Sequence, residues 1–199
     1  MTIRFADDFV CAFQYGSGAE SFHRDLGERL GKFGLELAPD KTRILRFCRF
    51  DLQGSGRFDF LGFEYYWERT RTGRLGVKRR TSRKKLCASL AAMTDWIRRN
   101  RSLRVGQLFP VLRAKYRGYW NYYGGIGNSA SLAQFFYRSQ RILFKWLNRR
   151  SQRRSYTWPG FQAVLDFFRV EGPRGSRSST ARLNSASREP LCPCGCEQH

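Results

Sequence analysis

Acidic side chains are scarce in this sequence. Its 199 residues include 37 Lys and Arg but only 16 Asp and Glu, so the formal net charge is +21 and the isoelectric point is about 10.6. So few carboxylates exclude the mixed-sign surface of an ordinary soluble enzyme. The excess of cations instead predicts a polyanionic partner, most simply a nucleic acid.

Long apolar runs are also missing. No segment approaches the ~20 consecutive apolar residues that a transmembrane helix needs, and the first residues lack the apolar region of a signal peptide. We therefore expect no membrane partner and a cytoplasmic protein associated with the nucleoid or with ribonucleoprotein. Its six cysteines are then expected to be reduced.

The C-terminal tail has little apolar content. Residues 171–199 are rich in Gly, Ser, Arg and Pro, which predicts a disordered segment. Cys192, Cys194 and Cys196, followed by His199, have the ligand types of a zinc site, but their C-x-C-x-C spacing is not the usual C-x2-C. We expect a tail without bound zinc.

The shortage of acids is concentrated in one block. Residues 79–154 contain 19 Lys and Arg and a single acid, Asp95, a net charge of +18, whereas residues 1–78 contain 13 basic and 11 acidic residues. Solvated surfaces normally mix both signs, and uncompensated cations repel one another unless phosphates neutralise them. This block is therefore the predicted nucleic-acid-binding region.

Hydrophobic periodicity divides the chain near residue 80. Before it, alternation predicts two short strands within residues 2–13 with the acids at their bend, a helix over 18–33, strands at 35–37 and 42–47, and a strand over 58–67 with a hairpin partner from 75. Ser17 and Glu20 have capping-box spacing, and Gly34 is the expected helix end.

After the boundary, apolar residues recur at helical spacing. Four helices are predicted, and their apolar positions are Leu86, Leu90, Met93 and Ile97; Val105, Leu108, Leu112, Tyr116 and Tyr119; Leu132, Phe135, Phe136, Ile142, Leu143, Trp146 and Leu147; and Phe161, Val164, Leu165 and Phe168. Ser82 is the predicted N-cap of the first. The expected fold class is α+β, with a β-rich module at 1–78, a basic all-α domain at 79–170 and the tail.

Adjacent aspartates stand in the apolar stretch "RFADDFV". A hairpin with Asp7 and Asp8 at its tip is suited to presenting oxygen ligands to Mg²⁺, which prefers carboxylates and substrate phosphates. An ordinary turn explains the pair about equally well. Burying two neighbouring carboxylates without a partner is costly, so the pair demands a compensating group.

Several motifs in order resemble the group II intron reverse transcriptase/maturases. "RFADDFV" is similar to the catalytic Y/F-x-D-D hairpin, "GLELAPDKT" to the following palm motif, and "FDFLGFEYYW" to the hairpin near the primer. "YRGYWNYYGG" and "FKWLNRRSQRRSYTWPGF" resemble the thumb or maturase-specific X domain. The resemblance covers roughly residues 2–169.

The resemblance implies roles for particular residues. Asp7 and Asp8 are the implied catalytic, Mg²⁺-binding pair of an RNA-directed DNA polymerase, and Lys41 matches the lysine proposed to help protonate pyrophosphate; a solvent-facing turn lysine is the alternative. Phe60, Leu61 and Gly62 match the hairpin that supports the primer. The implied partners are group II intron RNA and an RNA/DNA template-primer.

The basic block supplies the expected RNA contacts. Arginine binds phosphate in a bidentate manner, and the favoured residues are Arg79, Arg80, Arg83, Lys84, Lys85, Arg149, Arg150, Arg153 and Arg154. Exposed rings among Trp120, Tyr122, Tyr123 and Trp158 are candidates for stacking on unpaired bases. Core packing is the favoured interpretation for Trp120 and Trp146.

The family also uses an earlier palm aspartate and fingers, but only six residues precede Asp7. The chain is therefore expected to be the C-terminal portion of such a protein, whether a truncated frame, a broken frame or a split piece, and to be inactive alone as a polymerase. Two functions follow from the resemblance: part of a reverse transcriptase/maturase, or a non-catalytic RNA-binding splicing maturase.

Overall fold

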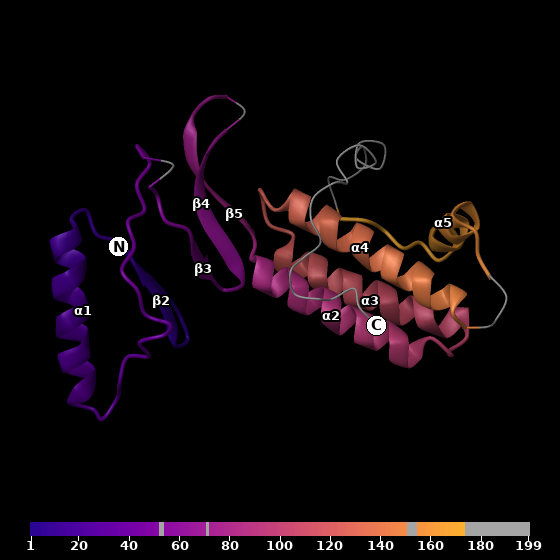
Figure 1. Ribbon diagram of the computed structural model, residues 1–199, viewed down its shortest axis with the longest axis horizontal. Coiled ribbons are helices and arrows are strands. Elements are labelled where there is room, and N and C mark those ends of the chain that lie inside the picture. Colours follow the sequence, from indigo (N-terminus) through magenta and orange to yellow (C-terminus); the bar gives the residue numbers. More distant parts are fainter. Residues whose placement is uncertain (52–53, 71, 151–154, 174–199) are drawn as a thin grey trace. The chain divides into compact units, whose positions relative to one another are not determined.

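The computed structural model describes residues 1–51, 54–70, 72–150 and 155–173, which form an α+β fold with five helices and two small antiparallel sheets (Figure 1). The chain divides into two compact units, Met1–Arg79 and Arg80–His199. We call them the first unit and the helical unit. Residues 174–199 of the predicted tail, which include its cysteines, lie outside the described residues.

The first unit begins with the expected hairpin. β1 (Thr2–Phe5) pairs antiparallel with β2 (Asp8–Cys11), with Phe5 opposite Asp8, so Ala6 and Asp7 form a two-residue loop. Ala6 has a φ of 52°, in the left-handed region, and its carbonyl accepts a 2.8 Å hydrogen bond from Arg4 Nε. The aspartates therefore stand where the alternation predicted them.

A single helix, α1 (Gly16–Gly31), follows this hairpin. The predicted capping box is wrong: the helix begins before Ser17, its N-cap is Tyr15, and no side chain caps it. Three residues after the helix, Gly34 has a φ of 68°, which a residue without Cβ adopts readily. The helix thus ends slightly earlier than predicted, but the glycine still reverses the chain.

The strands expected at 35–37 and 42–47 do not form. A strand requires a partner for its ladder of hydrogen bonds, and residues 43–48 make only isolated contacts of this kind. Gly56 N donates to Arg46 O at 2.7 Å, and Cys48 N donates to Ser55 Oγ at 3.1 Å. The apolar pattern there produces an extended loop.

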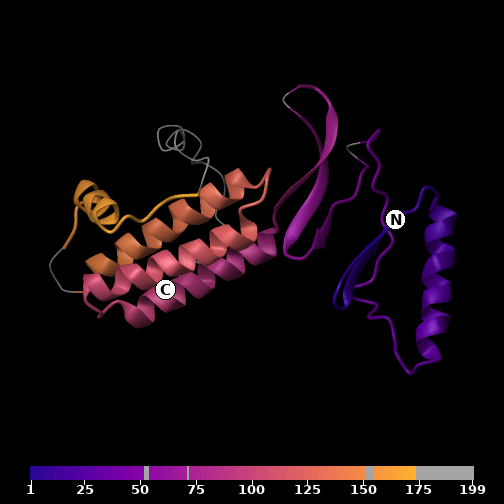
Figure 2. The ribbon, with the colours of Figure 1, turned by 180° about the vertical axis from the view of Figure 1, so that it is seen from behind.

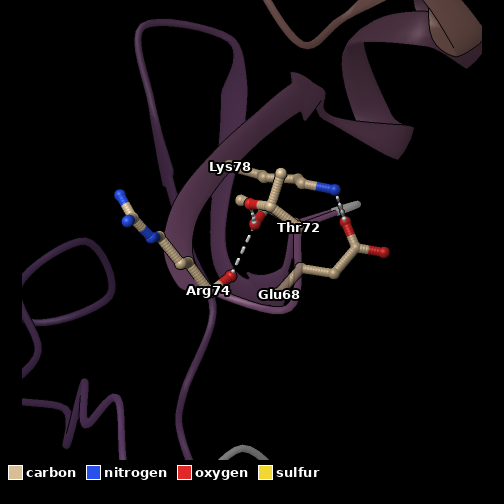
Figure 3. Close-up of polar contacts among 5 residues, drawn as sticks. Glu68, Thr72, Arg74 and Lys78 are labelled. Atoms are coloured by element: carbon tan, nitrogen blue, oxygen red, sulfur yellow. Dashed lines mark hydrogen bonds and ion pairs between the residues drawn. The ribbon is translucent and has the colours of Figure 1, made fainter.

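The second sheet has the order β3-β4-β5, formed by Phe58–Phe60, Phe63–Arg69 and Leu75–Thr81. In the β4–β5 hairpin, Lys78 Nζ lies 2.7 Å from Glu68 Oε2, and Thr70 Oγ1 bonds to Arg74 O at 2.9 Å (Figure 3). These polar contacts hold together the hairpin that the sequence predicted between the strand over 58–67 and its partner from 75.

The helical unit contains α2 (Arg83–Asn100), α3 (Val105–Tyr123), α4 (Ser129–Asn148) and α5 (Trp158–Phe167). The three long helices run side by side in both views (Figures 1 and 2). Ser82 Oγ accepts a hydrogen bond from Lys85 N at 3.4 Å, which confirms the predicted N-cap. The predicted stripe of α2 is confirmed as well, because all four of its apolar residues are buried.

The hydrophobic core belongs to the helical unit. Its fully buried members come from all four helices, and include Ile97, Leu108, Leu143 and Phe161, each with no exposed surface. In the described part of the first unit, Phe63 is the one buried apolar residue, and α1 buries none. The two units therefore differ in how far they can be stabilised by their own packing.

Candidate nucleic-acid interface

The Asp7–Asp8 hairpin is presented to solvent. Both aspartates are exposed, as is every residue of β1. The two carboxylates are not buried, so the desolvation cost that made them conspicuous in the sequence is absent. Because water solvates both carboxylates, no buried partner is needed to offset their charge.

The aspartate pair does not by itself fit a two-metal centre. Asp7 lies in the turn and Asp8 begins β2, where neighbouring side chains point to opposite faces of the sheet. Across the described residues, no three His, Cys, Asp or Glu side chains come together in a group able to hold a metal ion. Two-metal chemistry needs more oxygen ligands than this hairpin offers.

Lys41 and the second hairpin occupy separate local structures. Lys41 is exposed and ends a turn in which its N–H donates to Ala38 O at 3.1 Å. Leu61 and Gly62 form the two-residue loop between β3 and β4, and both have positive φ, 51° and 79°. Positive φ at both loop positions is the type I′ geometry that matches strand twist, although Leu61 adopts it at a cost of about 1 kcal/mol.

Basic residues cluster where β5 leads into α2. Arg79 is half-buried, with its guanidinium 5.3 Å from the Phe63 ring, and Arg80 is exposed. Arg83, Lys84 and Lys85 fill the first turn of α2, and all three are exposed. No acid accompanies them there, although a helix N-terminus favours anions. Cations at this position raise the local positive potential.

A second basic group lies after α4. Arg149 is exposed, Arg150 is half-buried, and the predicted contacts Arg153 and Arg154 lie outside the described residues. Nε and Nη2 of Arg150 are buried and have no hydrogen-bond partner in the described part of the chain. Desolvation lowers the pKa of this guanidinium, and Tyr156 opposes the shift.

The aromatic candidates divide between core and surface. Trp146 and Tyr123 are buried, in agreement with the core assignment for Trp146, and Trp120 packs against the core, stacked 5.6 Å from the Tyr116 ring. Tyr122 and Trp158 remain exposed at 58% and 38%. These two rings are the ones accessible for stacking on unpaired bases.

Buried tyrosines give the bundle an uncharged polar interior. Tyr116 Oη and Ser139 Oγ lie 2.8 Å apart inside the core, and burial raises the pKa of Tyr116 well above its ordinary value. Burial likewise raises the pKa of Tyr119 to about 12. None of the buried residues that the structure describes is charged, so the basic side chains of the unit lie at or near its surface.

Asn128 is a structurally important residue that the sequence analysis did not predict. It has no exposed surface; its Oδ1 accepts from Thr81 N at 2.8 Å, and its Nδ2 donates to Thr81 Oγ1 at 2.8 Å and to Tyr123 O at 2.9 Å. The amide thereby fixes the end of β5 against the α3–α4 connection, beside the basic first turn of α2. Its position after glycines and before an apolar helix is the sequence feature that could have indicated a role at the start of that helix.

Within the described residues, none of the helices combines the length and apolarity required to cross a bilayer. The chain matches no protein-family model, no curated protein and no solved structure.

Proposed function

We propose that this chain binds RNA through its helical unit and serves as the maturase part of a protein of the group II intron reverse transcriptase family. The supporting observation is the charge of residues 79–154, 19 basic against one acidic residue, on a bundle in which none of the described buried residues is charged. The single acid, Asp95, lies 3.5 Å from Arg98. The remaining cations need an external counterion, and RNA phosphates supply one.

The RNA-binding function is favoured over polymerisation for this chain. The motif order supports a palm assignment for residues 1–78 and a thumb or X-domain assignment for residues 79–170. However, the described donor set lacks the ligands of a two-metal centre. We therefore assign the chain to the splicing side of the family, with intron RNA as the partner and the cytoplasmic ribonucleoprotein as its place of action.

A salt titration of RNA binding tests the proposal. The full chain is titrated into labelled single-stranded RNA at several salt concentrations, beside a variant in which Arg83, Lys84 and Lys85 are alanine. Each phosphate contact contributes about −0.7 to the log–log slope on single strands, so losing three contacts flattens the slope by about 2. Affinity falls at the same time.

A matched variant separates specific placement from total charge. Arg29, Lys32 and Arg69 are exposed cations of the first unit, and replacing them by alanine removes the same charge. We expect its affinity and salt slope to stay near those of the unmodified chain. Binding that is independent of salt, or equally weakened by both variants, contradicts an interface on the helical unit.

A further inference from the structure

At one end of the helical bundle, the Trp146 ring lies against the guanidinium groups of two arginines. The Arg101 guanidinium, at the C-cap of α2, lies 5.2 Å from the Trp146 ring centroid, and the Arg149 guanidinium, at the C-cap of α4, lies 5.8 Å from it. Both distances are within cation–π range. The two chain segments that meet here are far apart in sequence, so the fold creates this arrangement.

The indole positions these guanidinium groups without neutralising them. A carboxylate partner would occupy their N–H donors, whereas a ring face attracts the cation and leaves its edge free. In the described residues, no carboxylate or carbonyl accepts a hydrogen bond from Arg101, Arg149 or Arg150. Among the described residues, nothing therefore occupies the donors of the exposed Arg101 and Arg149, which are open to a ligand.

The charge at this end exceeds what helix dipoles require. Cations near helix C-termini are favourable because each terminus is equivalent to about half a negative charge. Two such termini, α2 and α4, meet here beside the N-terminus of α3 (Figures 1 and 2). Residues 95–104 and 145–150, which lead into these two termini, contain the basic residues Arg98, Arg99, Arg101, Arg104, Lys145, Arg149 and Arg150 and one acid, Asp95. Dipole compensation accounts for a small part of this charge.

Arg150 has two buried N–H donor atoms that lack an acceptor among the described residues. These atoms, Nε and Nη2, are withdrawn from water, and their lack of a hydrogen-bond partner among the described residues is unfavourable for the donors of a charged group. An anion entering beside Arg149 and Arg150 supplies the missing acceptor. Phosphate suits the planar, forked geometry of guanidinium better than a point-like ligand does.

We propose that Arg101, Arg149 and Arg150, positioned by the Trp146 indole, form a phosphate-binding site for the backbone of an RNA strand at this end of the bundle. The proposal rests on the RNA-binding function proposed above and identifies the residues that bind the phosphates of the strand. Trp146 is a positioning residue, and the three arginines make the contacts. Arg101 was absent from the contacts that the sequence indicated.

A charge-conserving comparison tests the site. In the full chain, Arg101, Arg149 and Arg150 are replaced by Lys. A control replaces Arg113, Arg117 and Arg138 by Lys, because these three arginines stand over no ring of the described residues. Lysine keeps the charge but loses the fork and the planar stack. We expect about tenfold weaker binding of fluorescein-labelled single-stranded RNA by the cluster variant and less than about twofold for the control. Salt slopes stay unchanged for both because their charges are unchanged.

Each outcome has one meaning. If the unmodified chain and both variants bind RNA with equal affinity, the site is overturned, while salt-dependent RNA binding still stands. The same conclusion follows if the two variants are weakened equally. Failure of the unmodified chain to bind RNA overturns the proposed function as well. Because Arg150 is half-buried, the pair Arg101→Lys and Arg149→Lys is measured against Arg113→Lys and Arg117→Lys, with circular dichroism verifying the fold. These four residues are exposed, and the stacked pair is again expected to bind RNA more weakly.

Discussion

Replacing Asn128 by alanine removes the amide that joins the end of β5 to the α3–α4 connection. The side chain makes three hydrogen bonds of 2.8 to 2.9 Å, all in a region without solvent access. Alanine removes these three hydrogen bonds, to Thr81 N, Thr81 Oγ1 and Tyr123 O. Water has no route to them unless the connection opens.

The expected loss of stability follows from these three groups. A typical hydrogen bond contributes about 1 kcal/mol net, and a buried group left unpaired costs about 1–3 kcal/mol. Thr81 Oγ1 loses one incoming N–H but keeps its own hydroxyl hydrogen, so the lost bonds of the Thr81 N–H and the Tyr123 C=O dominate. We expect Asn128→Ala to lower the free energy of unfolding of the helical unit by about 3 kcal/mol.

Urea unfolding of the full chain, followed by far-ultraviolet circular dichroism, measures this loss. With an m-value of about 1.5 kcal/mol per M, a 3 kcal/mol loss lowers the midpoint by about 2 M. Asn121→Ala is the matched control, because Asn121 is exposed on α3, and its effect should stay within about 0.5 kcal/mol. Indistinguishable midpoints for the two variants would refute the structural role of Asn128.

Two further predictions concern protons and catalysis. Because burial raises the pKa of Tyr116 in the folded state, folding opposes its ionisation, so this part of the stability is present below pH ~10 and is lost as pH rises above that value. Tyr116→Phe should therefore reduce the alkaline loss of the urea midpoint, and an unchanged alkaline profile contradicts this. With Mg²⁺, an RNA template, a DNA primer and nucleotides, the chain should give no extension product, since the described residues bring no third ligand to Asp7 and Asp8. Extension that Asp7→Ala abolishes would show this expectation to be wrong.

The helices of the helical unit were the most predictable part of the fold, because their apolar residues pack against one another within that unit. Leu86, Leu90, Met93 and Ile97 recur at helical spacing, and each is buried against the same bundle. Ser82 also acts as predicted, since a hydroxyl before a helix has few competing uses. Local pattern and tertiary packing agree here, so the local pattern was sufficient.

Predictions failed where the same local sequence pattern is compatible with more than one structure. Ser17 and Glu20 have the spacing of a capping box, yet the helix starts at Gly16 and Ser17 falls inside it. Residues 42–47 alternate as a strand does, but no neighbouring strand completes a ladder with them. Alternation indicates which side chains share a face, and it carries no information about whether a partner strand is present.

The candidate interface was predictable in charge but not in arrangement. Counting residues located the cations of residues 79–154 and selected Arg149 and Arg150. Nothing in the sequence indicated that Arg101 shares the ring of Trp146 with Arg149, because the two arginines belong to different helices. Cation–π contacts between distant segments depend on the crossing of α2 and α4, which periodicity alone does not determine.

The first unit shows the limit of hydrophobic patterning most directly. Ile3, Phe5 and Phe9 follow the alternation of a half-buried strand, yet they remain exposed by 50%, 63% and 37%. The pattern predicted the hairpin correctly, but Ile3 and Phe5 lie on one face of it and Phe9 on the other, and the described residues cover these side chains only in part. Burial of such side chains is worth about 1.5–3 kcal/mol each, and here that stabilisation is realised only in part. The stability of this chain must therefore reside mainly in the helical unit, the same unit that carries the positive charge.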